Sequence, residues 1–442
     1  MTITMNRFKR AAAALGAMAA GALVLSGCGV TGAGDGSGGG GGLSPDASAG
    51  TTGEVNVLFM KQAGYTEDDI ATMIEDFNQE YPDVTVNPTF VSYEALHDKI
   101  VTAAPSGTYD VVLMDVIWPA EFASTGIVAD ITDRYPAEWN DEMLGGALIT
   151  AKYQGKYYGV PWYPSTKLFY YNADMVEKVG ASESDLETWD GVLEVAKKIK
   201  EQEGVQYPIA WSWGQAEALI CDYAQVLGAF GGQFTDDSGK LIINQGPGVE
   251  ALTWMKKTID DGLTNPNSTT FLEDDVSKTM ATGQAAFSLN WESTFRDLND
   301  PSISQVVDQV GVLATPKGQS GERPGVNGAM ALGIASRAKN PDAAWNFITF
   351  ISSQQEQEKF VKSTLPSWKA SYEDESVTKT NPEVFAAAKI AYDSSILRPQ
   401  VPDYSPVSLI IQVELQNALL GKKSPQQAMD DAVAAGNDVL ND

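Results

Sequence analysis

Cysteine, histidine and positive charge are all scarce in this chain. Its 442 residues include two cysteines and one histidine. Beyond the amino-terminal region only Cys221 remains, so that part of the chain cannot form an internal disulfide, and we interpret Cys221 as a buried small residue. A single histidine argues against Ser-His-Asp or Cys-His catalysis and against histidine-rich zinc sites. His97 lies in a helical pattern between Leu96 and Ile100, which indicates an ordinary helix residue.

The charge balance is strongly acidic. The chain carries 58 acidic and 30 basic residues, a formal net charge of −28. Nucleic acids and anionic membrane surfaces are bound through basic patches, so we expect neither as a partner. The acidity favours solubility and by itself indicates no particular ligand.

Residues 1–27 have the features of a secretory signal peptide. Arg7, Lys9 and Arg10 precede an apolar stretch, residues 11–25, that is too short to span a bilayer. The stretch ends in LSGC, which is similar to a bacterial lipobox and predicts a lipid anchor on Cys28 at the outer face of the cell membrane. The alternative is an ordinary signal peptide with a chance cysteine. Residues 28–53 are rich in glycine and serine and predict a flexible tether.

From Glu54 onward, strand and helix patterns alternate, which predicts an α/β fold with parallel strands and helices on both faces. About 390 residues exceed one typical core and favour two lobes. In open α/β sheets ligands bind beyond the carboxyl ends of the strands. Asp115, which ends an apolar strand, and Trp118 are therefore site candidates, although Asp115 could equally cap a helix.

Four segments, taken in order, resemble the extracellular solute-binding proteins of ABC transporters, in particular the maltose-binding-like family. They are residues 109–133, 153–175, 283–293 and 311–351, and the resemblance spans residues 54–442. It implies a type II periplasmic-binding-protein fold with two lobes, each a mixed, mostly parallel sheet flanked by helices, and a cleft between them. Lobe 1 would comprise residues 54–163 and 328–370, and lobe 2 residues 164–327 and 371–442.

The same resemblance implies a receptor that closes by a hinge movement on a mono- or oligosaccharide, with an oligosaccharide favoured. The receptor would deliver the sugar to the permease subunits of an ABC importer. We expect a monomer with no enzymatic activity, no cofactor and no metal. Two alternatives stay open: an extracellular enzyme acting on glycosides, and a binder of a non-sugar solute in the same fold. Polyamine binding, for example, would require a more acidic cleft.

Aromatic side chains are the leading site candidates, because their faces suit the C–H face of a pyranose. Trp291 matches the stacking tryptophan of the family. Trp162 and Tyr163 would form a platform at the lobe junction, or else pack the hinge. Trp211 and Trp213 alternate, so one would face the cleft and the other the core. The remaining ligand-binding positions that the resemblance implies are Gln62, Tyr65, Tyr93, Asp115, Gln215, Asn290, Asn327, Gly328, Arg398 and Tyr404. Asn290 could instead cap a turn, and Arg398 could pair with acidic neighbours.

Overall fold

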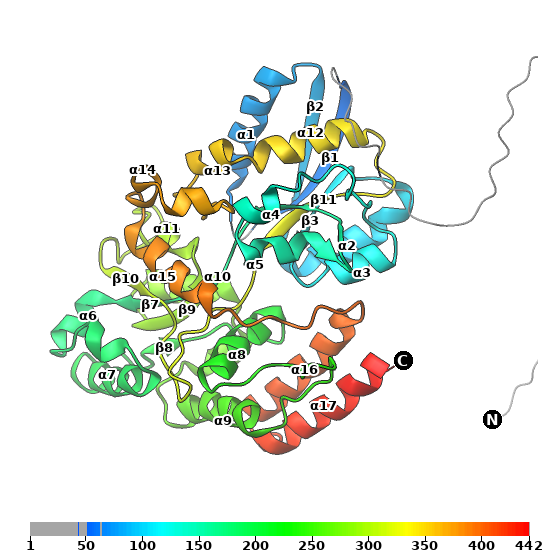
Figure 1. The fold of residues 1–442 in the computed structure, drawn as a ribbon. Helices are drawn as coiled ribbons and strands as arrows, with labels where there is room; N and C mark the ends of the chain where they lie inside the picture. The colour runs from blue at the N-terminus through cyan, green and yellow to red at the C-terminus, as the bar shows by residue number, and fades with distance from the viewer. Residues whose placement is uncertain (1–42, 44–50, 62–63, 442) are drawn as a thin grey trace, which may run out of the picture. The chain divides into compact units, whose positions relative to one another are not determined.

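The structure, a computed structural model, describes residues 43, 51–61 and 64–441, and this part of the chain contains two larger β-sheets (Figure 1). The first sheet has the strand order β2-β1-β3-β11-β6. Its strands are β1 (Gly53–Met60), β2 (Val84–Val91), β3 (Val111–Asp115), β6 (Val160–Tyr163) and β11 (Met330–Ile334). β1 runs parallel to β2 and β3, whereas β11 is antiparallel to β3 and β6.

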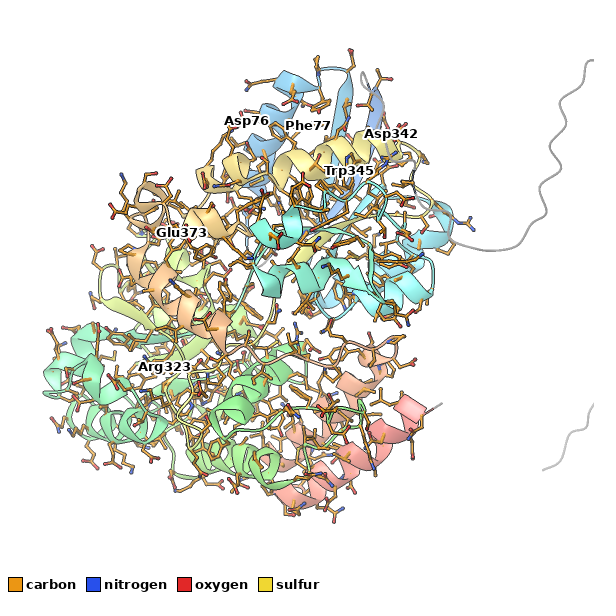
Figure 2. The ribbon with its side chains drawn as sticks, viewed as in Figure 1. Asp76, Phe77, Arg323, Asp342, Trp345 and Glu373 are labelled. Atoms are coloured by element: carbon orange, nitrogen blue, oxygen red, sulfur yellow. The ribbon has the colours of Figure 1, made fainter. Side chains whose placement is uncertain are left out.

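Helices on the first sheet begin and end where the sequence provides the appropriate caps. Helix α1 (Glu67–Glu80) starts with a capping box, in which Thr66 and Asp69 satisfy each other's backbone amides. Its Phe77, which is labelled in Figure 2, packs edge-on against Phe347 of α12 (Pro341–Ile351), with 5.2 Å between the ring centroids. The other helices of this part are α2 (Tyr93–Ala103), α3 (Pro119–Ser124), α4 (Trp139–Glu142), α5 (Gly145–Leu148) and α13 (Gln354–Lys359), and a short hairpin joins β4 (Lys152–Tyr153) and β5 (Lys156–Tyr157).

The second sheet has the order β10-β7-β9-β8. Its strands are β7 (Lys167–Asn172), β8 (Ile209–Ala210), β9 (Phe287–Trp291) and β10 (Val310–Leu313). β7 is antiparallel to both of its neighbours, and only β8 and β9 pair in parallel. Both sheets are therefore mixed as predicted, but within the described residues parallel pairings do not predominate.

A helical layer formed by distant parts of the chain accompanies the second sheet. Near the carboxyl terminus, α16 packs on α17, α8 and α9, and α17 also packs on α9 (Figure 1). The helices of this part are α6 (Ala173–Lys178), α7 (Trp189–Gln202), α8 (Glu217–Ala229), α9 (Gly246–Asp260), α10 (Glu273–Ala281), α11 (Thr294–Leu298), α14 (Glu375–Thr378), α15 (Pro382–Asp393), α16 (Tyr404–Leu419) and α17 (Pro425–Asn441).

The chain passes between the two sheets at short connections. β6 belongs to the first sheet and β7 to the second, so residues 164–166 form one crossing. The chain returns between β10 and β11. The exact lobe boundaries stay a prediction. None of the helices in the described part of the chain combines the length and apolarity that a bilayer crossing requires.

Candidate functional site

A cavity of about 260 Å³ lies where strands of both sheets end. Met60, Asp115, Tyr163 and Trp291 line it, and each is the last residue of its strand (β1, β3, β6 and β9). This is the location that the rule on carboxyl strand ends predicts for a ligand. Side chains from helices α2, α8, α10 and α11 also line it, as do Ser165, Gly328, Met330 and Arg398.

The indole of Trp291 is fixed from several sides. Its Nε1 donates a hydrogen bond to Oε1 of Glu273 at 3.3 Å, and Lys167 Nζ lies 5.3 Å from the ring centroid. Gly328 lies so close that a Cβ there would come within 2.3 Å of the ring. A larger residue at position 328 would therefore displace the indole.

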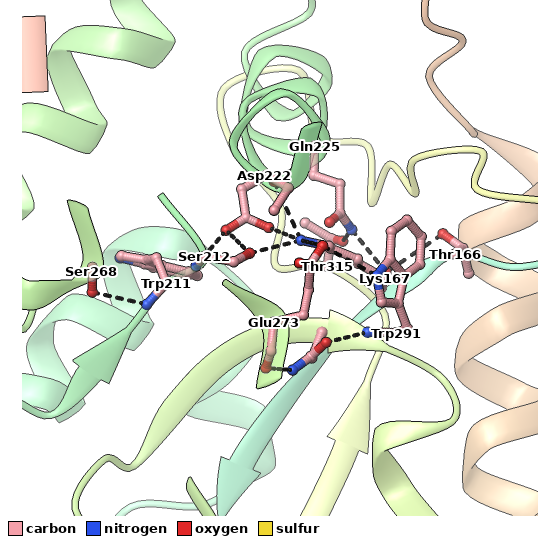
Figure 3. A network of polar contacts seen from close by, with 12 residues as sticks. Thr166, Lys167, Trp211, Ser212, Asp222, Gln225, Ser268, Glu273, Trp291 and Thr315 are labelled. Carbon is pink, nitrogen blue, oxygen red and sulfur yellow. Dashed lines mark hydrogen bonds and ion pairs between the residues drawn. The ribbon is translucent and has the colours of Figure 1, made fainter. Parts of the chain in front are cut away.

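Lys167 is fully buried beside this tryptophan, at the start of β7. Its Nζ lies 2.7 Å from Oδ1 of Asp222 and 3.2 Å from Oε1 of Glu273, and it donates to Oγ of Ser212 at 2.8 Å (Figure 3). Burial alone would lower the pKa of Lys167, and the two carboxylates raise it above its ordinary value. The ammonium therefore stays charged and forms the centre of a buried ion triad.

A second buried triad is centred on Arg398, which precedes α16. Its guanidinium lies 3.0 Å from Oδ1 of Asp115 and 2.9 Å from Oε1 of Glu217, and it also donates to the carbonyl of Asn327 at 2.9 Å. Glu217 also accepts hydrogen bonds from the hydroxyls of Tyr404 and Ser408. Asp115, at the end of a strand in the first sheet, is thereby tied to α8 and α16.

Glu292 follows Trp291 and is a buried carboxyl next to the crossing segment. It accepts hydrogen bonds from Ser165 Oγ at 2.8 Å, from the Thr166 amide at 3.2 Å and from Thr364 Oγ1 at 3.1 Å. Burial raises the pKa of Glu292 to about 7, and these hydrogen bonds oppose the rise. Glu292 has no basic partner among the ion pairs of the described residues.

Comparison with known proteins identifies the family. The model of the family described as "Bacterial extracellular solute-binding protein" matches residues 63–358. The chain belongs to this family. Members are receptors for solutes, and the family description places them outside the cell.

Three similar proteins match over half or more of this solute-binding protein. The maltose-bound T. maritima MalE3 structure is 29% identical with a TM-score of 0.80, and the match covers 87% of this chain and 99% of that one. The "Probable ABC transporter-binding protein" of Deinococcus radiodurans is 25% identical, covering 74% of this chain and 79% of the relative. An arabinooligosaccharide-binding protein of Bacillus subtilis is 26% identical, covering 50% and 51%. The structural match confirms the predicted two-lobe α/β periplasmic-binding-protein fold.

Seven of the residues predicted to bind ligand line the cavity of this solute-binding protein. They come from strands of both sheets, from α2, and from the segments before β11 and α16, and they are Tyr93, Asp115, Tyr163, Asn290, Trp291, Gly328 and Arg398. Asn290 lies within β9, and its Oδ1 accepts a hydrogen bond from the Trp291 amide at 2.9 Å. Arg398 likewise pairs with acidic neighbours while it lines the cavity.

The prediction that Trp211 or Trp213 faces the cleft is wrong. Both are buried in one core and stack on each other, with ring centroids 5.4 Å apart and planes 10° apart. β8 ends at Ala210, so the two residues are not in an extended strand and the rule of alternating faces does not apply. Trp211 Nε1 donates to Thr264 Oγ1 at 3.0 Å inside the core.

Other predicted positions also lie away from the cavity lining. Trp162 packs between Phe59 and Tyr65, with centroid distances of 5.1 and 4.9 Å, so Trp162 and Tyr65 belong to the core. Gln215 is exposed beside α8 without lining the cavity, and Asn327 donates its side-chain amide to the Gly146 carbonyl at 2.9 Å. Tyr404 is buried, and its hydroxyl donates a hydrogen bond to Glu217. The predicted ligand-binding residue Gln62 and the predicted lipidation site Cys28 lie outside the described residues.

Several charged residues at the site were not predicted. Lys167 begins the mainly apolar strand KLFYYN, and Asp222 interrupts the apolar stretch ALICDYAQVL; a lone charge at such a position could have indicated a buried pair. Glu217, Glu273 and Asp274 occupy the first turns of helices, where acidic residues are common for electrostatic reasons alone. No group of three or more metal-ligating side chains that could hold an ion occurs in the described part of the chain.

Proposed function

We propose that this solute-binding protein is the receptor of an ABC importer and binds a carbohydrate in the cavity. The observation that supports this most is the lining itself: an indole and two phenols, Trp291, Tyr93 and Tyr163, stand among carboxylates and an amide. Apolar C–H faces of a sugar pack on aromatic rings, and its hydroxyls need fixed donors and acceptors. The maltose in the MalE3 structure and the name of the Bacillus subtilis relative support the same ligand class.

Hinge closure of the two lobes accompanies binding in this proposal. Ligand contacts to both lobes at once favour the closed state, and the cavity takes side chains from both sheets. The lobes would comprise residues 54–163 with 328–370 and residues 164–327 with 371–442. Small-molecule pockets commonly have volumes of about 300–1,000 Å³. The cavity of about 260 Å³ lies close to the lower end of this range.

Binding without catalysis is the second part of the proposal. Glycosidases use two carboxyl groups, one as an acid and one as a base or nucleophile. Two lining carboxylates, Asp115 and Glu217, are both paired with the Arg398 guanidinium, which argues against either role for them. Release of reducing sugar from an oligosaccharide by the purified protein would contradict this part.

Calorimetric titration with mono- to tetrasaccharides tests the ligand class. We expect heat from at least one sugar, and at least about tenfold weaker binding by Trp291→Ala, since tenfold corresponds to about 1.4 kcal/mol. Trp345→Ala is the matched control, because Trp345 lies on α12, is half-buried and does not line the cavity (Figure 2). Heat from a peptide or an amino acid, with none from any sugar, would overturn the proposal.

We also propose that Cys28 carries a lipid anchor and that residues 28–53 tether the folded part to the membrane. The LSGC sequence supports the anchor and the glycine-rich composition supports the tether. Growth with a labelled fatty acid should label the wild-type protein and leave Cys28→Ala unlabelled. Label that persists in Cys28→Ala would refute the anchor.

A further inference from the structure

The cavity lining carries a large excess of negative charge. Seven carboxylates line it, against the two cations Lys278 and Arg398, which leaves a formal excess of five negative charges. The seven come from five different helices and strands and are Glu94, Asp115, Glu217, Glu273, Asp274, Asp275 and Asp297. Hydroxyls of a neutral sugar need acceptors, but they do not require this net charge.

The buried cations at the cavity are already matched by more carboxylates than they can neutralise. Arg398 is shared by Asp115 and Glu217. Lys167, just behind the lining, is shared by Asp222 and Glu273. Each triad holds one cation and two carboxylates, so each leaves one negative charge beside the cavity. Neither cation is available to bind an anionic ligand.

Carboxylates also approach one another from both sides of the cavity. Glu94 lies in the first turn of α2, which packs on the first sheet, and Asp274 lies in the first turn of α10, which packs on the second. Partial desolvation and the nearby carboxylates of Glu273, Glu94 and Asp275 raise the pKa of Asp274, and the ammonium of Lys278 opposes the rise. Closing the lobes on a neutral ligand would leave this repulsion in place.

The buried hydroxyl of Tyr163 is a second, independent indication that the ligand carries a positive charge. Its side chain is 2% exposed, lines the cavity, and has no hydrogen-bond partner for its hydroxyl among the described residues. Burial, followed by the negative charges of Glu292 and Asp115, raises the pKa of this phenol. A buried hydroxyl that lacks a partner is costly, so a ligand group is expected to satisfy it. The surrounding negative field favours a positively charged donor in that place.

We propose that the ligand is an amino sugar, a carbohydrate whose protonated amine lies between the carboxylates of the two lobes while its ring stacks on Trp291. This inference rests on the proposed carbohydrate-binding function and narrows it. An alkylammonium group has three donors, enough to reach Tyr163 and two carboxylates at once. The same excess of negative charge disfavours uronic acids and other anionic sugars.

Calorimetric titration with pairs of sugars that differ in the amine tests whether the positive charge of the ligand strengthens binding. The probes are glucosamine against glucose, galactosamine against galactose, and fully deacetylated chitobiose against its N-acetylated form and cellobiose. At neutral pH and low salt we expect the free amine to bind at least tenfold more tightly than its neutral match in at least one pair. Added salt should weaken the amine more than the neutral sugar, because screening acts on charge.

Variants of the lining carboxylates test whether the preference for an amine arises in the cavity. Glu94→Gln and Asp274→Asn should each reduce the preference for the amine severalfold, and the exposed Glu201→Gln on α7 should leave it unchanged. Trp291-dependent binding of neutral sugars with no preference for an amine would overturn this inference and leave the proposed function standing. Binding of spermidine with no binding of any sugar would overturn both. Loss of the preference in Glu201→Gln as well would place the charge effect outside the cavity and overturn the inference.

Discussion

Replacing Lys167 with methionine is expected to lower the free energy of unfolding by about 3–5 kcal/mol, because removing one partner of a buried ion pair leaves the other charge uncompensated. Asp222 is fully buried and lies 2.7 Å from the ammonium that would be lost. Glu273, 3.2 Å from the same nitrogen, would lose its partner as well. The methionine side chain fills most of the space of the lysine stem. The loss of stability would therefore result from the missing charge and not from a cavity.

Urea denaturation at neutral pH measures this effect. The double variant Lys167→Met/Asp222→Asn should recover much of the loss, since it removes both charges and keeps an acceptor for Ser212, which donates to Asp222 at 3.0 Å. Lys197→Met is the matched control, because Lys197 pairs with Glu194 on the surface of α7 and exposed pairs contribute at most about 1 kcal/mol. A loss of less than 1 kcal/mol in Lys167→Met would show that the buried triad is not charged.

Trp291 depends on the same triad. The ammonium faces its ring at 5.3 Å, and Glu273 accepts from its Nε1. Without Lys167, Glu273 loses the cation that orients it, so the indole loses two of its supports. Weaker sugar binding by Lys167→Met would therefore accompany the loss of stability, whereas Lys197→Met should change neither.

The location of the cavity could be predicted from the sequence, because it depends on local patterns. An apolar run that ends in Asp115 and one that ends in Asn290 and Trp291 are strands with polar or aromatic ends, and ligands bind beyond such ends in α/β sheets. The rule requires only that strands be recognised, and strand periodicity is a short-range property of the chain. Asp115, Asn290 and Trp291 accordingly line the cavity.

The choice among the aromatic residues failed for a different reason. A tryptophan serves equally well in a core and in a sugar site, so composition cannot separate the two uses. Trp211 and Trp213 differ from Trp291 only in what surrounds them: α7, α8 and α9 cover the first two, whereas the bare Gly328 backbone lies against the third. These neighbours come from distant parts of the sequence and are brought together only by the fold.

The acidity of the cavity illustrates the same limit. The net charge of −28 indicates no ligand when it is read as a sum over the chain. What the acidic residues indicate about a ligand depends on where the fold places them, because seven carboxylates from five helices and strands line one cavity. Likewise, Lys167 and Asp222 are 55 residues apart, and no local pattern joins them.

The contribution of Glu292 to the free energy of unfolding is expected to fall by about 3 kcal/mol as the pH rises from about 4.5 to about 7. The folded state raises the pKa of this carboxyl from 4.5 to about 7, so between these values the folded protein binds a proton that the unfolded chain has released. Proton release therefore favours unfolding. The stabilisation is complete below pH 4.5 and is lost as the pH passes through the pKa of the folded state, about 7.

Other carboxyls have lowered pKa values, and their effect has the opposite sign, so the decisive quantity is the difference between the wild type and Glu292→Gln. Glutamine keeps an acceptor for Ser165 and Thr166, and its amide can donate to Thr364 Oγ1. In urea denaturation, Glu292→Gln should match the wild type at low pH and exceed it at pH values above about 7. Glu201→Gln, exposed on α7, should follow the wild type throughout. Parallel curves for the wild type and Glu292→Gln would mean that the carboxyl beside the 164–166 crossing is ionised in the folded protein, and that Ser165, Thr166 and Thr364 hold it as an anion.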